Sequence, residues 1–314
     1  MKPKMQTSDA SNFLGISLQA IHKTIKAKKL QTYKSQNKVY FLHDTAKDIF
    51  QLNLNPTCFT WQNLKGGVGK TNLSFATALR LTSYGLKVAV IDLDQQGNFT
   101  QACNVDASTY PVMFDIITKS LNLNDSMVSV ADGLDLLPSR IENALLDNLF
   151  AVNSLPVDRE LKKRINPLKN YYDVIFIDCP PSLSASVCAA TLCADYVIVP
   201  TDPEKFSLSG LHITLSEINK NIALKYEATV NTKILLNKFD ARTNLSHQVL
   251  TSLLSDIKFN DKMFSTFIRV NQEFPNSIAK SLSIYESLKP STAKEDIDLL
   301  TREIIELCKS ANIK

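Results

Sequence analysis

The chain of 314 residues has 44% hydrophobic residues, 21% charged residues and a net charge of +4, a composition typical of folded globular proteins and unlike that of disordered chains. No apolar run reaches the about 18 uninterrupted residues of a membrane helix, and the N-terminus lacks a signal-peptide hydrophobic stretch, so we expect a cytosolic protein. Six cysteines are scattered without a C-x-x-C pair, which favours reduced core thiols over disulfides or a metal site.

Charge is unevenly distributed along the chain. Residues 1–55 contain nine lysines, no arginine and three aspartates, which gives this segment a net charge of +6, whereas the remaining residues sum to −2. Such an asymmetry favours nucleic acid as a partner of the N-terminal segment, with a solvated lysine face as the alternative.

Cap and turn residues predict two helices at the start of the chain. Ser8 is expected to cap a short helix, Gly15 to turn the chain, and Ser17 to cap a second helix over residues 18–27. The spacing in the second helix predicts an inward face of Leu18, Ile21 and Ile25. The outward face then carries side chains that can contact DNA, namely Gln19, His22, Lys23 and Lys26.

A hairpin and a third helix are predicted to follow. Strands at residues 31–33 and 39–41 flank a polar turn at residues 35–38, and Asp44 is expected to cap a helix that runs to residue 51. The segment resembles the winged helix-turn-helix of the MerR and excisionase type. The resemblance implies a small DNA-binding domain over residues 1–55.

From residue 56 onward, short apolar strands alternate with helices. Strands are expected at residues 58–62, 87–93, 174–177, 196–199 and 233–236, with a helix over residues 70–84. This alternation predicts a second domain, residues 56–314, of the α/β class with a mostly parallel sheet. Residues 103–170 give no clear pattern and are assigned only to mixed helices and loops.

The strongest signal is the sequence K-G-G-V-G-K-T between the first strand and the following helix. Glycines allow successive backbone N–H groups to surround phosphates at a helix N-terminus, Lys70 reaches the β- and γ-phosphates, and the Thr71 hydroxyl binds Mg²⁺. ATP and Mg²⁺ are therefore the expected ligands. The expected nucleotide-binding residues are Lys65, Gly66, Gly67, Val68, Gly69, Lys70, Thr71 and Asn72.

The loop differs from the general Walker A pattern, because Leu64 occupies the first glycine position and Lys65 precedes the glycines. In this it resembles the deviant Walker A ATPases, the family of ParA, Soj and MinD, over roughly residues 57–314. The resemblance implies a P-loop NTPase fold with helices on both faces of the sheet. It also implies an ATP-sandwiched homodimer, in which Lys65 reaches the nucleotide of the partner.

Further segments resemble family motifs in order and spacing. Residues 92–98 look like D-x-D-P-Q-G-N, with Gln95 in place of the proline, and the resemblance implies that Asp94 is the catalytic carboxylate, together with Lys65 and Lys70. Asp92 is expected to support the loop or the magnesium shell, and Asp178 to reach Mg²⁺ from a Walker B-like strand. Residues 200–204 resemble a segment near the dimer interface, and residues 234–240 one that offers Asn237 to adenine.

The combined pattern implies a ParA-type partition ATPase, and residues 240–246 match a stretch typical of that branch. The family logic implies slow hydrolysis, an ATP-dependent homodimer on nonspecific DNA in the nucleoid, a ParB-like centromere-binding partner, and repression of its own operator. Arg269 and Lys280 are weak candidates for DNA contacts in the larger domain.

Two alternatives remain open at this level. A MinD-like membrane-cycling ATPase would need an amphipathic C-terminal helix, and residues 296–314 have apolar residues at helical spacing, although a last core helix is the simpler interpretation. The other alternative is an ATP-responsive helix-turn-helix transcription regulator.

Overall fold

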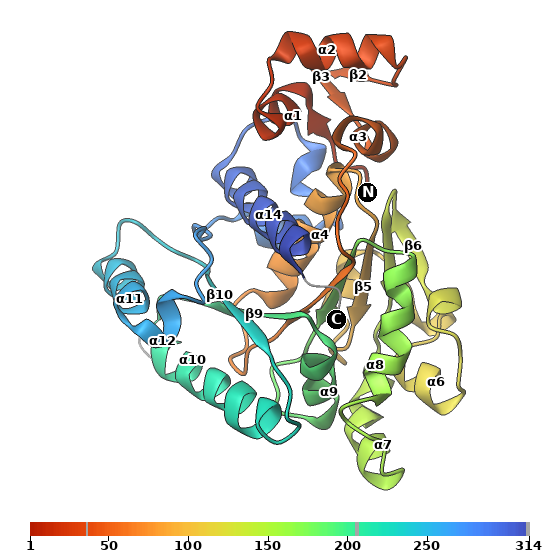
Figure 1. Cartoon of the computed structure of the whole chain (residues 1–314), viewed down its shortest axis with the longest axis vertical. Coiled ribbons are helices and arrows are strands. Elements are labelled where there is room, and N and C mark those ends of the chain that lie inside the picture. The colour runs from red at the N-terminus through yellow and green to blue at the C-terminus, as the bar shows by residue number, and fades with distance from the viewer. Residues whose placement is uncertain (36, 205–206, 312–314) are drawn as a thin grey trace.

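A computed structural model describes residues 1–35, 37–204 and 207–311, so Gln36 of the expected turn and the last three residues of the expected C-terminal helix lie outside the described residues. A seven-stranded sheet with helices on both faces forms most of the molecule, and a small unit lies at one end (Figure 1). The strand order is β10-β9-β4-β8-β5-β7-β6, and β6 is the antiparallel strand. The strands are β4 (Thr57–Trp61), β5 (Val88–Asp92), β6 (Val128–Ala131), β7 (Leu134–Leu137), β8 (Val174–Asp178), β9 (Tyr196–Thr201) and β10 (Asn231–Leu236).

The sheet is covered on both faces because its central strands are apolar on both sides. All residues of β4, β5 and β8 are buried, as expected for parallel strands between helical layers. Alternate side chains enter different layers: Phe59 and Trp61 join one hydrophobic cluster, whereas Cys58, the residue before Phe59, joins another.

The helices divide between these layers. One layer holds α4 and α14, another α6 to α9, and a third cluster joins α10 to α12 with β9 and β10. The helices are α1 (Thr7–Leu14), α2 (Leu18–Ala27), α3 (His43–Phe50), α4 (Lys70–Ser83), α5 (Asn98–Ala102), α6 (Met113–Thr118), α7 (Leu146–Val152), α8 (Glu160–Ile165), α9 (Ala185–Cys193), α10 (Ser207–Ser216), α11 (Asn244–Ser255), α12 (Ile257–Asn260), α13 (Glu273–Ala279) and α14 (Thr292–Ser310).

The C-terminal helix α14 is a core helix. Ile297, Leu300 and Ile304 are fully buried in the cluster that also contains the apolar face of α4. The apolar stripe that the membrane alternative required is therefore already used inside the fold. Within the part of the chain that the structure describes, no helix is long and apolar enough to cross a membrane.

The N-terminal unit has the predicted order of elements with several corrections. Ser8 and Asp44 are not caps, because α1 begins at Thr7 after Gln6, and α3 begins at His43 after Leu42. The first hairpin strand is β2 (Tyr33–Ser35) rather than residues 31–33, and it pairs with β3 (Lys38–Phe41), to which an unpredicted strand, β1 (Met5–Gln6), adds an edge. Leu18 was expected to face inward but is 44% exposed, since only Ile21 and Ile25 reach the core.

This unit is docked on the end of α4 that lies far from the phosphate loop. Phe13 and Phe50 pack against Tyr84, with ring centroids 4.6 and 5.0 Å apart. Gly85 has φ +80°, and a Cβ at this position would collide with the backbone nitrogen of Lys47 in α3. The hydrophobic cluster of α4 continues without a break into the N-terminal unit.

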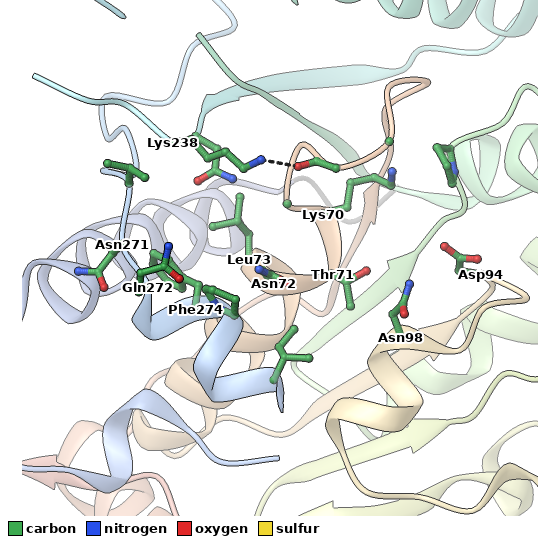
Figure 2. Close-up of a pocket in the computed structure, with 18 of the residues that line it drawn as sticks. Lys70, Thr71, Asn72, Leu73, Asp94, Asn98, Lys238, Asn271, Gln272 and Phe274 are labelled. Carbon is green, nitrogen blue, oxygen red and sulfur yellow. Dashed lines mark hydrogen bonds between the residues drawn. The ribbon is translucent and has the colours of Figure 1, made fainter. Parts of the chain in front are cut away.

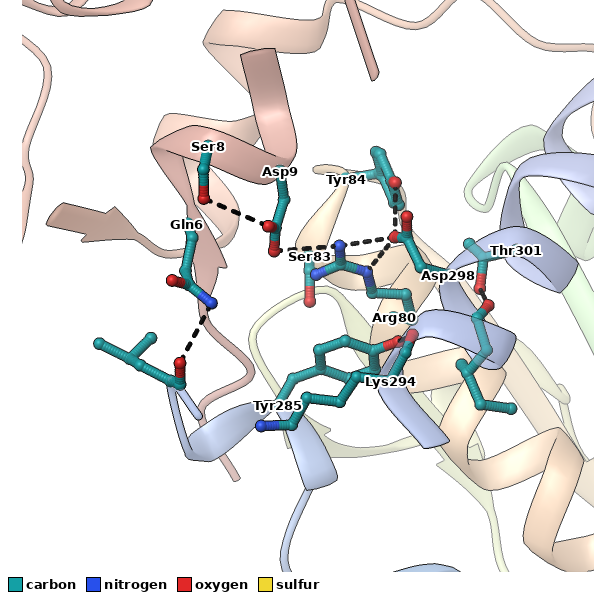
Figure 3. Close-up of polar contacts among 12 residues, drawn as sticks. Gln6, Ser8, Asp9, Arg80, Ser83, Tyr84, Tyr285, Lys294, Asp298 and Thr301 are labelled. Carbon is teal, nitrogen blue, oxygen red and sulfur yellow. Dashed lines mark hydrogen bonds and ion pairs between the residues drawn. The ribbon is translucent and has the colours of Figure 1, made fainter. Parts of the chain in front are cut away.

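A buried polar network joins the same surfaces (Figure 3). The guanidinium of Arg80 is 2.6 Å from the Asp298 carboxylate and 3.5 Å from that of Asp9 in α1. Its carbon Cζ lies 4.3 Å from the ring centre of Tyr285, whose hydroxyl donates to the Lys294 carbonyl in α14. The N-terminal unit, α4 and α14 therefore meet around one buried cation.

Candidate nucleotide site

A cavity of about 620 Å³ lies where β4 gives way to α4, at the carboxyl edge of the parallel sheet (Figure 2). The loop between them contains Gly67 at φ +77° and Gly69 at φ +93°, backbone conformations that favour glycine. A Cβ on Gly69 would overlap the amide of Asn237, so glycine is also required for packing. Both glycines are therefore needed for the backbone path of this loop.

Lys70 and Thr71, the first residues of α4, line this cavity. The ammonium of Lys70 is 3.3 Å from the Asn63 carbonyl, and its burial lowers the pKa of the lysine despite the nearby carboxylates of Asp178 and Asp94. A phosphate would supply the negative charge that this partly desolvated lysine lacks.

The Thr71 hydroxyl donates to the Asp178 carboxylate at 2.7 Å, and the Ser74 hydroxyl donates to its other oxygen at 3.3 Å. Asp178 is fully buried at the end of β8, and burial raises its pKa to about 6 although Thr71 and Lys70 oppose the shift. A bound divalent cation would compensate this buried carboxylate, and the oxygen donors fit Mg²⁺. Among the described residues, no group of three or more His, Cys, Asp or Glu side chains is placed to hold a metal ion.

The two aspartates at the end of β5 have different surroundings: Asp92 is its last residue, and Asp94 follows it by two. Asp94 lines the cavity and is 7% exposed, with one oxygen accepting from the Gln96 backbone N–H. Asp92 is fully buried and accepts from the backbone N–H and hydroxyl of Thr100. Asp92 also accepts from the Asp94 backbone N–H at 3.2 Å, so loop support, one of its two expected roles, has contacts in the structure. Like Asp178, its carboxylate is not among the groups that line the cavity.

Lys65 points out of the cavity that the rest of its loop forms. Its ammonium lies 2.7 Å from Asp202 and 2.6 Å from Glu204, with the Ser207 hydroxyl at 3.2 Å. Burial would lower the pKa of Lys65, but the hydrogen bonds and charges of the two carboxylates raise it. The loop thus carries two lysines with opposite orientations, one inward and one outward.

The wall opposite the loop comes from the C-terminal third of the chain. Asn237 donates to the Val68 carbonyl at 2.8 Å, and Lys238, which the sequence did not single out, donates to the Gly67 carbonyl at 2.7 Å. Residues 269–278 add Asn271, Gln272 and Phe274 to the lining, as Figure 2 shows. The sequence contains no local signal for these residues, since only the tertiary fold brings them to the loop.

The predicted DNA-contacting residues lie in two places. Four of them are exposed side chains of α2, namely Gln19, His22, Lys23 and Lys26. Arg269 lies at the rim of the cavity and is ion-paired with Asp296 and Glu295, so most of its hydrogen-bonding capacity is used within the protein. Lys280 is exposed just after α13.

Comparisons with known proteins identify relatives of this chain. A family model described as an AAA domain matches residues 57–231. The sporulation initiation inhibitor protein Soj of Bacillus subtilis is 32% identical over 216 residues, which cover 67% of this chain and 82% of that protein. The chromosome-partitioning ATPase Soj of Treponema pallidum is 27% identical over 253 residues, covering 77% of this chain and 94% of that protein.

Solved structures with the same fold include a plasmid partition protein from Borrelia burgdorferi bound to AMPPNP. It superposes with a TM-score of 0.65 at 22% identity and covers 80% of this chain and 99% of its own. An ATP complex of a single-residue variant of Cyanothece McdA gives a TM-score of 0.70 at 18% identity, with 81% and 98% covered. Both likenesses concern the fold.

Proposed function

The chain belongs to the ParA/Soj family of P-loop ATPases, and from this premise we propose that it is the ATPase of a DNA partition system. ATP binding builds a homodimer that holds nonspecific DNA, and a ParB-like centromere-binding protein stimulates hydrolysis and release. Turnover is slow, because the useful product is a change in binding state. The protein acts in the cytoplasm on the nucleoid.

The observation that carries this proposal is the orientation of Lys65. Its ammonium belongs to the phosphate loop but lies beside Asp202 and Glu204, away from the loop's own cavity. A cation placed in this way is available to the phosphates of a second protomer once the two carboxylates release it. The orientation therefore supports a dimer that assembles around ATP.

The groups in and beside the cavity then have separate roles in binding and hydrolysing ATP. The loop N–H groups and Lys70 bind the phosphates, and Asp94 orients the attacking water. Magnesium, when bound, neutralises charge on the transferred phosphoryl group, and Thr71 and Asp178 are the groups that would hold it. Asn237 and the wall opposite the loop bind the nucleoside.

DNA binding is assigned first to the N-terminal unit as a winged helix-turn-helix. Support comes from α2, whose Gln19, His22, Lys23 and Lys26 lie at helical spacing, and from the hairpin β2–β3 beside it. This unit would read the operator, while basic residues of the larger unit, including Lys280, add nonspecific phosphate contacts.

The test is fluorescence anisotropy with random-sequence duplex DNA in ATP–Mg²⁺ and in ADP–Mg²⁺ across a salt series. We expect tight, salt-sensitive binding with ATP and weak binding with ADP. In a Lys23→Gln, Lys26→Gln double variant the salt slope should fall, while an exposed lysine on α8, Lys162, changed to Gln serves as the matched control. Weak DNA binding in both nucleotides would contradict the proposal.

Two variants separate nucleotide binding from turnover. Lys70→Ala is expected to abolish ATP binding, and Asp94→Ala to retain binding but block hydrolysis. Nucleotide titration and phosphate release measure the two effects. Retained ATP binding in Lys70→Ala would refute the assignment of the cavity.

A transcription regulator that responds to ATP is the second candidate. It is favoured by the docking of the N-terminal unit on α4, the helix that begins at Lys70. Equal DNA affinity in ATP and ADP, with specificity for one operator sequence, would select this function.

A further inference from the structure

Three side chains that follow β9, here called the clasp, hold the outward lysine of the phosphate loop: Asp202, Glu204 and Ser207. The Lys65 ammonium is 2.7 Å from the first carboxylate and 2.6 Å from the second. Although burial lowers the pKa of Lys65, hydrogen bonds to these carboxylates raise it above its usual value, so the amine stays charged. Within a single copy of the chain, Lys65 therefore already has anionic partners.

The two carboxylates of the clasp differ in burial. The side chain of Glu204 is 62% exposed, so water solvates it when Lys65 leaves. The side chain of Asp202 is only 2% exposed, and its other side-chain partner among the described residues is the Ser207 hydroxyl, at 2.6 Å. Departure of Lys65 leaves Asp202 as a buried carboxylate with a single hydroxyl, which is costly. Asp202 is therefore the group that resists release.

Both sides of this contact are anchored to the same part of the fold. Asn63, before the loop, is 2% exposed, and its amide donates to the Pro200 carbonyl in β9 at 2.6 Å. Its side-chain oxygen accepts from the Lys65 backbone N–H at 2.8 Å and from the Thr214 hydroxyl in α10 at 3.3 Å. Because these bonds tie the loop to the segment that carries the clasp, release takes a swing of the Lys65 side chain rather than a movement of the loop.

We propose that the clasp is an autoinhibitory contact, which withholds Lys65 from the nucleotide of a second copy until a triphosphate there competes with Asp202. This inference rests on the proposed function, in which Lys65 crosses to the partner. A triphosphate carries more negative charge than a diphosphate, so ATP opens the clasp more readily than ADP. Because only copies with an open clasp pair, the clasp weakens the dimer in proportion to the fraction that is closed.

Acetylation of Lys65 measures the clasp within one copy of the chain. Full-length protein without added nucleotide is treated with N-hydroxysuccinimidyl acetate, and peptide mass spectrometry compares Lys65 with the exposed Lys162 of α8. A charged, ion-paired amine acylates slowly, so Asp202→Asn should accelerate labelling of Lys65 about threefold or more and leave Lys162 unchanged. Asp125→Asn removes the same charge at an exposed position and should change neither rate.

Sedimentation velocity with a nonhydrolysable ATP analogue and Mg²⁺ measures the effect on dimerisation. Asp202→Asn should lower the Kd of the dimer about tenfold or more, because two clasps open in each dimer, and Asp125→Asn should leave it unchanged. Glu204→Gln should act in the same direction in both assays but more weakly. It changes an exposed side chain, so it keeps the test valid even if the buried variant folds poorly.

The two assays separate failure of the clasp from failure of the proposed function. Unchanged labelling of Lys65 in both variants, with normal dimerisation, would refute the clasp alone. Faster labelling with an unchanged or weaker dimer would refute its inhibitory role and would assign Asp202 to support of the interface. Absence of a dimer in the wild type and in every variant would refute the proposed function, and the role of the clasp with it.

Discussion

The buried network around Arg80 predicts that its two sides are energetically unequal. Arg80 is 1% exposed, and Asp298 is the carboxylate closest to it, at 2.6 Å. Asp9 is farther away, at 3.5 Å, and 32% exposed. One nitrogen of the buried guanidinium already lacks a hydrogen-bond partner among the described residues. Changing Asp298 to Asn therefore leaves this cation with only a distant, partly solvated counter-charge.

Removing Arg80 instead of Asp298 should lower the free energy of unfolding much less. Without Arg80, Asp298 still accepts from the Tyr84 hydroxyl at 2.7 Å and pairs with Arg302 at 2.8 Å. We expect Asp298→Asn to lower the free energy of unfolding by about 3 to 5 kcal/mol, the cost of an uncompensated buried charge. Arg80→Met fills the same space without a charge and should cost only about 1 kcal/mol of hydrogen bonding. Asp9→Asn should cost less than about 1 kcal/mol.

Urea denaturation of the full-length variants at neutral pH measures these differences. A loss of about 3 kcal/mol lowers the midpoint by about 1 M when the m-value is about 3 kcal/mol per M. The order Asp298→Asn, Arg80→Met, Asp9→Asn from most to least destabilising is the essential result. If Arg80→Met is as destabilising as Asp298→Asn, the cation is not held mainly by Asp298 and the reasoning fails.

Three further predictions are each measured by urea denaturation. Gly85→Ala should lower the free energy of unfolding by about 1 to 3 kcal/mol, because φ is +80° and the new Cβ meets α3. Gly210→Ala, where a Cβ finds nothing within 4 Å, should instead raise it by up to about 1 kcal/mol by favouring the helix α10, and equal effects of the two changes would contradict this. With its pKa raised to about 6, Asp178 stays protonated in the fold while the unfolded chain ionises, so without Mg²⁺ stability should fall as pH rises from about 4 to about 6. Asp178→Asn should show a smaller decline, since the pKa of the neighbouring Asp92 is also raised by burial, and an identical pH slope in both proteins would refute it. Ser17 accepts from the Ala20 backbone N–H at 3.2 Å, so Ser17→Ala should cost about 1 kcal/mol and Ser17→Asp almost nothing; equal losses would exclude the cap.

The features of the site that could be predicted best from the sequence are those formed by residues next to one another in the chain. Gly67, Gly69 and Lys70 belong to one loop whose conformation depends on the residues themselves, and Asp178 ends an apolar run long enough to identify a buried strand. Short-range chemistry determines these features. They could therefore be located before any tertiary contact was known.

The parts that were missed depend on contacts between distant segments. Lys238 and Asn271 reach the cavity only because the chain returns beside the loop after β10. Leu18 satisfies the helical spacing of an inward residue, yet α2 lies at the surface of a unit too small to cover it. The strand β6 lies at the edge of the sheet, where partial burial weakens the alternation that would have identified it, and β7 beside it is only four residues long.

The docking of the N-terminal unit also limits where this protein can be truncated. Near residue 55 the sequence changes to a pattern of alternating strands and helices, but the hydrophobic core continues across that point through Phe50 and Tyr84. A chain that starts at residue 56 would expose aromatic surface to water and leave Arg80 without one of its carboxylates. Transplanting the unit onto a relative should therefore succeed only when Arg80, Tyr84 and Gly85 are transferred with it, so the smallest exchangeable module includes the end of α4.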